Sequence, residues 1–365
     1  MKVVYQLRGV GAEAARRAEA LALEQSVEMP IEAVADRRVL RDVVARVESI
    51  EPQSDGTSLA RLALSGESIG GDAGQLMNML FGNSSLLDDV RVLEVEVPVS
   101  LGARFGGPQL GISGIRRLTN VNGRALSCTA LKPIGSSIED LSRMTRVFCH
   151  AGVDVIKDDH GWAADARASF HERVVACQRE IDTAVRGRST RTLYAPAISG
   201  SLDAMREQIR FAMAHGVSMV LVAPMVAGLS NLQALRREFP EIAFLAHPAL
   251  AGNQMAPAAL LGTLFRLFGA DASIFPNHGG RFSYSRAVCA AIAGALRAPL
   301  NGLRAALPVP AGGMTVERVP ELVGEYGRDA MLLIGGSLLI AREQLASRSR
   351  AFVEAVAAAS SEVAT

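Results

Sequence analysis

Lysine, cysteine, net charge and long apolar runs are all scarce in this sequence of 365 residues. Its 38 basic side chains nearly balance 37 acidic ones, and a formal net charge of +1 argues against strong attraction to nucleic acid or acidic membranes. The four cysteines show no CxxC or other metal-ligand spacing. We therefore expect buried thiols in a reducing compartment.

The distribution of apolar residues also predicts no targeting or membrane-spanning segment. Residues 1–11 have no continuous apolar region of the kind found in secretory signals. The longest apolar stretch, 217–229, is too short to span a membrane and is interrupted by Pro224 and Gly228. A cytoplasmic protein that binds neither membranes nor nucleic acid is expected.

The scarcity of lysine is informative because lysine and arginine differ chemically. Only Lys2, Lys132 and Lys157 occur, so the other 35 of the 38 basic residues are arginine. Arginine stays protonated at any working pH, whereas a buried lysine can lose its proton and react with carbonyl compounds or carbon dioxide. Two interior lysines are thus candidate reactive groups, although codon bias with two stray lysines would give the same count.

Residues 1–105 have the element order of a small α+β domain. Apolar alternation predicts strands and helical apolar spacing predicts helices. The expected elements are a strand at 1–9, a helix at 12–25, strands at 41–52 and 57–65, a helix at 70–83 and a strand at 90–98. This βαββαβ order is typical of a ferredoxin-like sandwich. The Gly/Pro-rich segment 104–112 predicts a boundary near residue 105, with a second domain over 106–365.

The second domain repeats one strand-then-helix unit. Short apolar runs begin near residues 126, 153, 193, 218, 242, 273, 307 and 331, and a helical stretch follows each. Eight such units predict an α/β fold of the (β/α)8 TIM-barrel type. A doubly wound open sheet is the competitor, but it usually carries fewer strands and a glycine fingerprint after the first one, which is missing here.

Chemistry-bearing residues fall where these strands end, which is where TIM barrels hold their active sites. They are Lys132 after the first strand, Lys157, Asp158, Asp159 and His160 after the second, His247 after the fifth, Asn277, His278 and Arg281 after the sixth, and the pairs Gly312–Gly313 and Gly335–Gly336 after the seventh and eighth. Both interior lysines therefore occupy active-site positions, and this favours a functional role for them.

These residues predict a metal site and a phosphate site. Consecutive ionisable groups at the end of an apolar strand are costly unless they bind something, and a carboxylate, an imidazole and a carbamylated lysine can hold Mg²⁺ or a related divalent ion. Glycine pairs let backbone N–H groups approach a phosphate. The alternatives are a structural ion-pair cluster, tight turns without ligand, and structural or solvated roles for His247 and His278. Together, the metal site, the titratable lysine and the phosphate-binding loops predict enolisation of a phosphorylated carbonyl compound.

Four segments carry a family resemblance. They are 105–112 (FGGPQLGI), 122–133 (NGRALSCTALKP), 152–161 (GVDVIKDDHG) and 307–313 (LPVPAGG). In order and spacing they resemble the large subunit of ribulose-bisphosphate carboxylase. The resemblance covers nearly the whole chain. It implies Mg²⁺ held with a CO₂-derived lysine carbamate, and a homodimer with active sites at the subunit interface.

The resemblance also implies a role for each matching residue. Lys132 matches the proton-abstracting lysine, and Lys157 matches the carbamylated lysine. Asp159 matches a metal ligand and His160 stands at the position of another, while His247 matches a histidine of the substrate site. Asn83 matches an asparagine that reaches into the partner's site, and Gly312, Gly313, Gly335 and Gly336 match the phosphate loops. Apart from the resemblance, Arg281 is expected to bind substrate or phosphate, and His278 is a candidate second proton carrier.

Departures from the family pattern narrow the chemistry. His160 replaces a glutamate ligand, and Ala311 replaces a serine before the seventh-strand glycines. Pro248 replaces an arginine that binds a second phosphate, so a bisphosphate substrate is disfavoured. The segment 276–285 has no lysine, although this loop normally carries the lysine that steadies carboxylation. Enolisation is therefore expected to remain and carboxylation to be lost, as in Rubisco-like proteins.

The run Lys157–His160 and the compact length resemble the group of Rubisco-like proteins that isomerises 5-methylthioribulose 1-phosphate in sulfur salvage, and such an isomerase is the preferred hypothesis. An alternative is a decarboxylase, transcarboxylase or hydrolase of a branched 3-oxo sugar-acid phosphate. A true ribulose-bisphosphate carboxylase is disfavoured by Pro248 and by the missing loop lysine. A catalytically inactive binding protein is disfavoured by the two lysines at strand ends.

Overall fold

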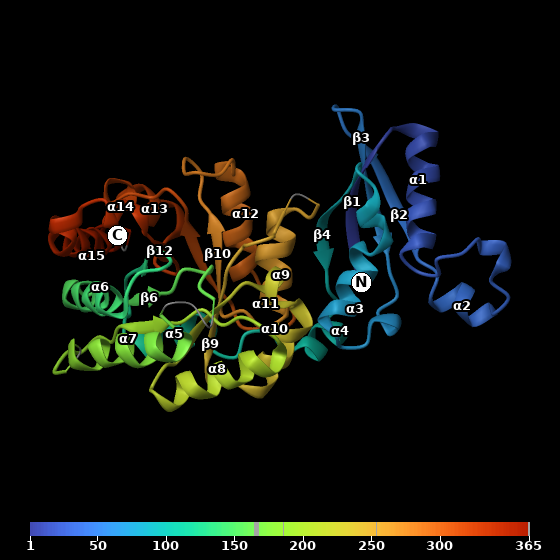
Figure 1. Ribbon diagram of the computed structural model, residues 1–365. Helices are drawn as coiled ribbons and strands as arrows, with labels where there is room; N and C mark the ends of the chain where they lie inside the picture. The colour runs from blue at the N-terminus through green and yellow to red at the C-terminus, as the bar shows by residue number, and fades with distance from the viewer. Residues whose placement is uncertain (164–167, 185, 253, 364–365) are drawn as a thin grey trace.

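The computed structural model describes residues 1–163, 168–184, 186–252 and 254–363, which form a small α+β part and a larger barrel (Figure 1). The predicted fold class is confirmed. The small part contains one antiparallel sheet in the order β2-β3-β1-β4. Its strands are β1 Lys2–Arg8, β2 Arg46–Pro52, β3 Thr57–Ala63 and β4 Val90–Glu96.

Two helices cross between these strands and complete the βαββαβ order. They are α1 (Gly11–Glu24) and α3 (Ala73–Phe81). The second strand begins five residues later than the predicted start at 41, at Arg46, because residues Arg37–Asp42 form a short helix, α2. The Asp36 carboxylate caps α2 by accepting from the backbone N–H of Arg38, an N-terminal signal that the alternation of residues 41–52 conceals.

All eight predicted barrel strands are present. They are β5 Leu126–Ala130, β6 Val155–Lys157, β7 Leu193–Ala195, β8 Met219–Val222, β9 Ala243–Ala246, β10 Ala272–Pro276, β11 Leu307–Ala311 and β12 Met331–Leu333. They pair in parallel as β12-β5-β6-β7 and β11-β10-β9-β8. A bridge between Ala197 and Leu221 joins the two groups on one side, and contact between β11 and β12 closes the barrel on the other.

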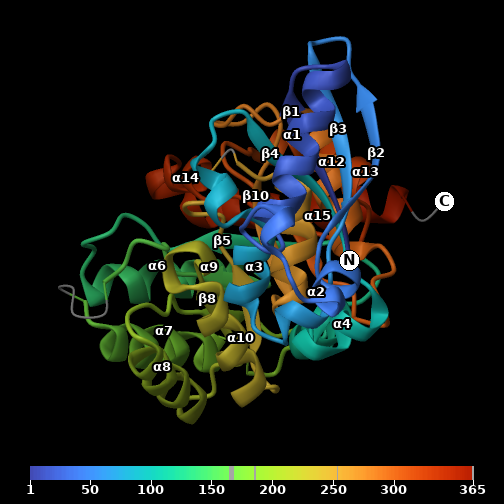
Figure 2. The ribbon, with the colours of Figure 1, turned by 90° about the vertical axis from the view of Figure 1, so that its right-hand side faces the viewer.

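Helices surround the strands (Figure 2). The longer ones are α6 Ile138–Ala151, α7 Phe170–Ala184, α8 Leu202–Ala214, α10 Leu229–Glu238, α12 Arg286–Arg297, α13 Val319–Tyr326 and α15 Leu345–Glu362, and a π-helical segment, Ala258–Leu264, runs into α11, Phe265–Leu267. Short helices α4 (Val99–Phe105), α9 (Pro224–Ala227) and α14 (Gly336–Leu339) lie in connections. None of the described helices combines the length and apolarity needed to cross a membrane.

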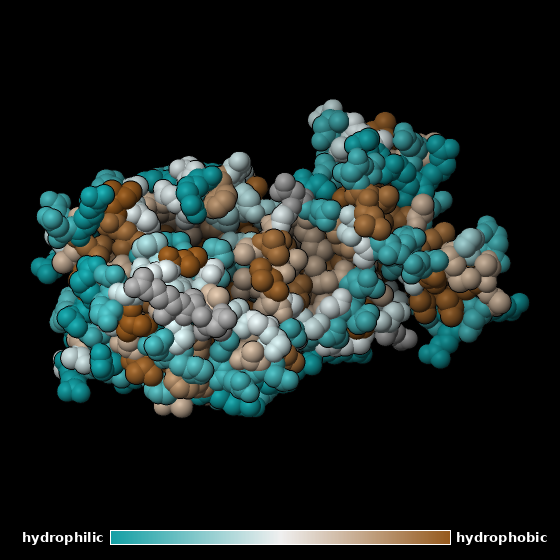
Figure 3. Space-filling model, viewed as in Figure 1, coloured by the Kyte–Doolittle hydropathy of each residue, from teal (hydrophilic) through white to brown (hydrophobic). Residues whose placement is uncertain are grey.

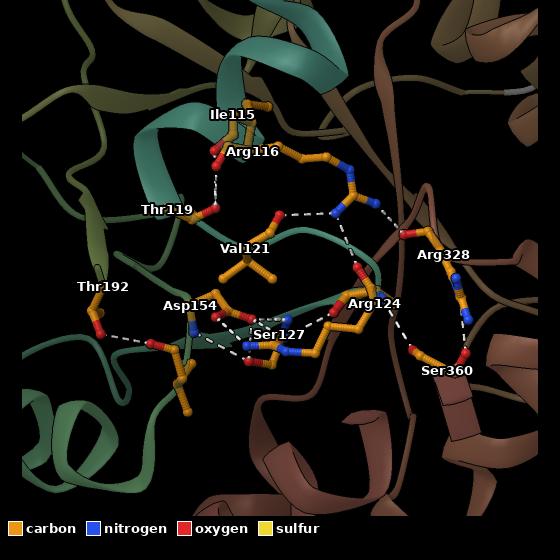
Figure 4. Close-up of polar contacts among 12 residues, drawn as sticks. Ile115, Arg116, Thr119, Val121, Arg124, Ser127, Asp154, Thr192, Arg328 and Ser360 are labelled. Atoms are coloured by element: carbon orange, nitrogen blue, oxygen red, sulfur yellow. Dashed lines mark hydrogen bonds and ion pairs between the residues drawn. The ribbon is translucent and has the colours of Figure 1, made fainter. Parts of the chain in front are cut away.

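The amino end of the barrel is closed by helix α5 (Gly111–Thr119), whose Ile115 joins the buried apolar cluster inside the strands. Next to α5, backbone and side-chain polar groups at the start of the strands form hydrogen bonds with the buried carboxylate of Asp154 (Figure 4). Asp154 precedes β6, accepts from the Arg124 guanidinium at 2.7 and 2.8 Å, and accepts from the Ser127 backbone N–H at 2.8 Å.

Asp271 has the corresponding position before β10. Its carboxylate accepts from the backbone N–H groups of Leu110 and Gly111, both at 2.8 Å, and from that of Phe244 at 2.9 Å. The buried Arg236 guanidinium donates to the same carboxylate at 2.9 Å. One charge therefore ties the start of α5 to two neighbouring strands and the helix layer.

The small part is fixed to the barrel by specific polar contacts. The Gln233 side chain of α10 accepts from the Ala73 N–H at 2.9 Å and donates to the Gly71 carbonyl at 2.8 Å. The edge strand β4 also pairs with the segment after β9, since the Ala256 N–H donates to the Val92 carbonyl at 2.7 Å. These contacts hold α3 beside the carboxyl end of the barrel.

We predict that Asp271→Ala lowers the free energy of unfolding of the barrel by about 3–5 kcal/mol, because it leaves a buried arginine and three N–H groups without their acceptor. Urea unfolding followed through the fluorescence of Trp162, the single and buried tryptophan, measures the change. The control is Asp203→Ala, which removes an exposed carboxylate and should leave the midpoint unchanged. Equal midpoints for both variants would contradict the prediction.

Candidate active site

The last residue of β6, Lys157, has a buried amine at the carboxyl end of the barrel. The side chain is packed inside the strand layer and is 4% exposed, and Nζ donates to the Asp158 carbonyl at 2.7 Å. Burial lowers the pKa of this amine, against the opposing effect of neighbouring Cys128 and Asp159. A lowered pKa increases the unprotonated fraction, which is the form that reacts with CO₂.

Asp158 faces the opposite way and anchors the strand end. Its carboxylate is fully buried and accepts from Arg173 Nε at 3.1 Å, the Tyr194 hydroxyl at 2.7 Å and the Ala197 N–H at 3.2 Å. Arg173 is itself buried, with its guanidinium 4.9 Å from the centre of the Trp162 ring. Neither Arg173 nor Tyr194 belongs to a sequence motif, so the sequence alone predicts no role for them.

Asp159 points back toward the barrel mouth and meets two basic side chains. Lys132 Nζ, from the segment after β5, contacts one carboxylate oxygen, and His160 Nδ1 lies 2.9 Å from the other. Burial opposes ionisation of Asp159, but the hydrogen bonds from His160 and Lys132 outweigh it and hold its pKa below the usual range. The carboxylate is therefore ionised at neutral pH.

His247, directly after β9, stacks on the His160 ring with centroids 3.7 Å apart and planes 15° apart. Burial and the neighbouring groups Lys157 and His160 lower the pKa of His247 to about 2, so the ring is neutral. Its Nδ1 accepts from the Ala249 N–H at 3.1 Å. The ring proton is consequently on Nε2, which is free to donate to a ligand. The structure thus gathers five predicted residues: Lys132, Lys157, Asp159, His160 and His247.

The predicted phosphate loops are packed against each other. Gly312 and Gly313 both have left-handed backbones, with φ of +85° and +86°. A Cβ at Gly313 would lie 2.9 Å from the Arg281 backbone nitrogen, which donates to the Gly312 carbonyl at 3.2 Å. Ser337 Oγ, next to the second glycine pair, donates to the Met314 carbonyl at 2.6 Å. The loops after β10, β11 and β12 therefore form one continuous wall.

His278 is held by helix α13 and has no described contact with the lysine–aspartate cluster. Its Nε2 lies 2.7 Å from the Glu325 carboxylate and 3.9 Å from Glu321. Among the described residues these three form the one group of His, Cys, Asp or Glu side chains arranged closely enough for a metal ion. Arg286, however, pairs with Glu325 at 2.7 Å and with Glu321 at 3.0 Å, which favours an ion-pair network. Both glutamates were missed because no sequence motif connects them to His278.

Asn83 lies in the small part, at the start of a 3-10 turn (Asn83–Leu86), and is exposed. Its side-chain amide donates to Glu24 at 2.9 Å and to Glu28 at 2.6 Å, so it is not part of the cluster in its own barrel. The family resemblance points to Asn83, whereas no sequence motif points to the two glutamates.

A cavity of about 570 Å³ lies between α3 and the segments after β8 and β9. Most of its large lining side chains are apolar. They include Met77, Phe81, Met225, Leu250 and Met255. Apolar surface gathers over α9 on the face shown in Figure 3. Leu250 is three residues from His247 in the chain, so the cavity borders the segment that carries this ring.

Known proteins similar to this chain match it over nearly its whole length. Residues 111–272 match the family described as ribulose bisphosphate carboxylase large chain, catalytic domain. The chain is 48% identical to 5-methylthioribulose-1-phosphate isomerase of Rhodospirillum rubrum over 99% of this chain and 97% of that protein. It is 31% identical to 2,3-diketo-5-methylthiopentyl-1-phosphate enolase of Microcystis aeruginosa, over 88% and 83%. The crystal structure of a Rubisco-like protein from Rhodopseudomonas palustris matches with a TM-score of 0.91 and 44% identity, over 98% and 97%.

We predict that Lys157 forms a carbamate with CO₂, since burial favours its free amine. Carbon-13 NMR with labelled bicarbonate and Mg²⁺ should show a carbamate signal in the wild type and none in Lys157→Met. The matched control is Lys2→Met, which removes a half-exposed lysine paired with Glu48 and should keep the signal. A signal that survives in folded Lys157→Met would refute the assignment.

Proposed function

The chain belongs to the ribulose-bisphosphate carboxylase large-chain family, as one of its Rubisco-like members, and we propose that it isomerises 5-methylthioribulose 1-phosphate by enolisation. The observation that carries the proposal is the contact between Lys132 and Asp159 beside buried Lys157 and stacked His160 and His247. The 48% identity to a relative with this activity over nearly the full length of both chains supports the choice of substrate.

Lys157, Asp159 and His160 have a donor set that fits a Mg²⁺ ion. Asp159 offers an ionised carboxylate, and a carbamate on Lys157 adds a further oxygen ligand, as Mg²⁺ prefers. His160 is the one nitrogen donor and also tolerates Mn²⁺ or Fe²⁺. When bound, the ion polarises the substrate carbonyl and stabilises the negative charge that develops on enolisation.

Lys132 is the residue that moves the proton. In its unprotonated form, reached when the ion pair with Asp159 opens and the ammonium proton passes to solvent, the Lys132 amine removes a proton from the carbon beside the carbonyl group. Return of a proton at a different carbon gives the isomer. Before this step Asp159 holds the Lys132 side chain in place, and the neutral His247 ring directs its Nε2–H toward a substrate oxygen. His278 lies in the wall of the mouth, where the 2.7 Å contact with Glu325 fixes it, and we assign the first proton transfer to Lys132 alone.

A single phosphate fits the rest of the mouth. Arg281 and the loop of Gly312 and Gly313 are joined by a backbone hydrogen bond and supply a cation and a backbone free of Cβ atoms. On the His247 side the chain has Pro248, which cannot bind a second phosphate. The apolar cavity near Leu250 supports a substrate with an uncharged thioether end. We further propose a cytoplasmic homodimer in which Asn83 completes the partner's site.

A second candidate is enolisation of 2,3-diketo-5-methylthiopentyl 1-phosphate. It is favoured by the relative from Microcystis aeruginosa, which is 31% identical over most of both chains. The two substrates share the phosphate and the thioether, and both reactions begin with removal of a proton from a carbon beside a carbonyl group. A direct comparison of the two phosphates under one assay separates the candidates.

The test is proton NMR in D2O with Mg²⁺, bicarbonate and each phosphate in turn. Loss of a carbon-bound proton signal with growth of an isomer from 5-methylthioribulose 1-phosphate supports the proposal, and chelation of the metal should stop both. Turnover of the diketone alone would assign the enolase. Exchange or decarboxylation seen only with branched 3-oxo sugar-acid phosphates would replace the proposal.

We predict that Lys132→Met reduces proton exchange by about 10²–10⁴-fold, since general-base catalysis contributes this much. Lys2→Met is the control, because it removes a lysine of the small part that is outside the barrel, and it should exchange at the wild-type rate. Wild-type exchange in Lys132→Met with intact Trp162 fluorescence is the result that excludes Lys132 as the base.

A further inference from the structure

The amide of Asn83 is held between two carboxylates on the surface of the small part. Nδ2 donates to Glu24 at 2.9 Å and to Glu28 at 2.6 Å. An asparagine amide has two N–H donors and one carbonyl oxygen, so both donors are used. The reverse orientation would place the oxygen against two negative charges. Asn83 therefore presents only an acceptor, Oδ1, to whatever covers this surface.

Glu28 adopts a backbone conformation that glycine would adopt more easily. Its φ is +54°, in the left-handed region, and its N–H donates to the Leu23 carbonyl at 2.9 Å where the chain leaves α1. The left-handed conformation costs a side-chain-bearing residue roughly 1–2 kcal/mol. The helix end alone would favour glycine here, whereas the 2.6 Å contact with Asn83 explains the glutamate.

The end of α1 and the segment carrying Asn83 are fixed relative to each other. Gln25 is 6% exposed, and its side chain donates to the Met79 carbonyl of α3 at 2.7 Å. The Tyr5 hydroxyl of β1 donates to the Leu80 carbonyl at 2.7 Å. The exposed cluster of Glu24, Glu28 and Asn83 thus stands on a rigid base, which lowers the entropic cost of holding three exposed side chains together.

The surface around this cluster fits a second copy of the chain. Beside Asn83, Leu86 is 85% exposed and Leu87 48% exposed. The carboxyl end of the barrel carries apolar side chains of the same kind, with Val226 59% exposed and Leu250 73% exposed. The glutamates also match the cationic side chain of Arg281 in charge. An ordered polar cluster flanked by exposed leucines is typical of an interface that is apolar at its core.

We propose that Glu28 is a positioning residue, which orients Asn83 so that its Oδ1 accepts a hydrogen bond from a substrate hydroxyl in the active site of a second copy. This inference rests on the proposed function. Glu28 itself does not touch the substrate. It acts by occupying one amide donor, so that the amide cannot turn and offer a donor to the hydroxyl.

Glu28→Gly separates positioning from stability, because glycine suits the left-handed backbone and removes only the side chain. We expect an unchanged or higher unfolding midpoint together with a fall in kcat/KM of about tenfold, the value of one hydrogen bond. In an Asn83→Ala background, Glu28→Gly should have no further effect on kcat/KM. The control is Glu32→Gln, at an exposed glutamate in the same segment between α1 and α2. Independent effects of the two substitutions would overturn the proposal.

Mixed dimers test action across the interface. Lys132→Met has an intact Glu28 and an inactive barrel, whereas Glu28→Gly has an intact barrel. After joint unfolding and refolding, activity should rise roughly fivefold above the two proteins kept apart, because half of the dimers then hold one complete site. No rise would show that Glu28 acts within its own subunit. An inactive wild type with every phosphate tested would instead refute the proposed function.

Discussion

The buried contact of Asp158 with Arg173 and Tyr194 determines the geometry of the barrel mouth. Strand β6 is only three residues long, so strand pairing alone does not fix the directions of the side chains that follow it. Because Asp158 is bound on the helix side by three donors, its neighbours Lys157 and Asp159 both face the mouth. Removing either Asp158 or Arg173 would leave the other charge buried and unpaired. Because that is costly, the contact stays formed and keeps the end of β6 in one conformation.

Arginine and lysine have separate tasks in this molecule. Arg173, Arg236 and Arg266 are buried. The first two bind the carboxylates of Asp158 and Asp271 at strand ends, and Arg266 binds backbone carbonyls at the end of α12 and in the segment before β11. A guanidinium suits this role because it stays charged and offers several donors in a fixed plane. Lysine occurs in the barrel only at two strand ends, where a removable proton is useful. The composition therefore reflects a division between permanent and titratable positive charge.

The sequence predicts the framework well because hydrophobic periodicity and strand-end position are local signals. All eight barrel strands and the βαββαβ order follow from them, as does the grouping of Lys132, Lys157, Asp159, His160 and His247. Contacts that depend on packing between distant elements could not be read in this way. The pairing of His278 with Glu325 spans 47 residues and has no motif, and α2 is hidden by a strand-like alternation that Asp36 overrides through capping.

The contact between the loops after β10 and β11 affects how ligands enter and leave. A Cβ on Gly280 would lie 1.8 Å from the Gly312 carbonyl oxygen, so the two backbones touch with no side chain between them. The Arg318 guanidinium also donates to the His278 carbonyl at 3.0 Å. The loop after β10 is therefore held by the backbone of the loop after β11 on one side and by Arg318 on the other, and it cannot swing open as a lid without breaking both sets of contacts. Shielding of a reactive intermediate from bulk water then depends on parts of the molecule other than a movement of this loop.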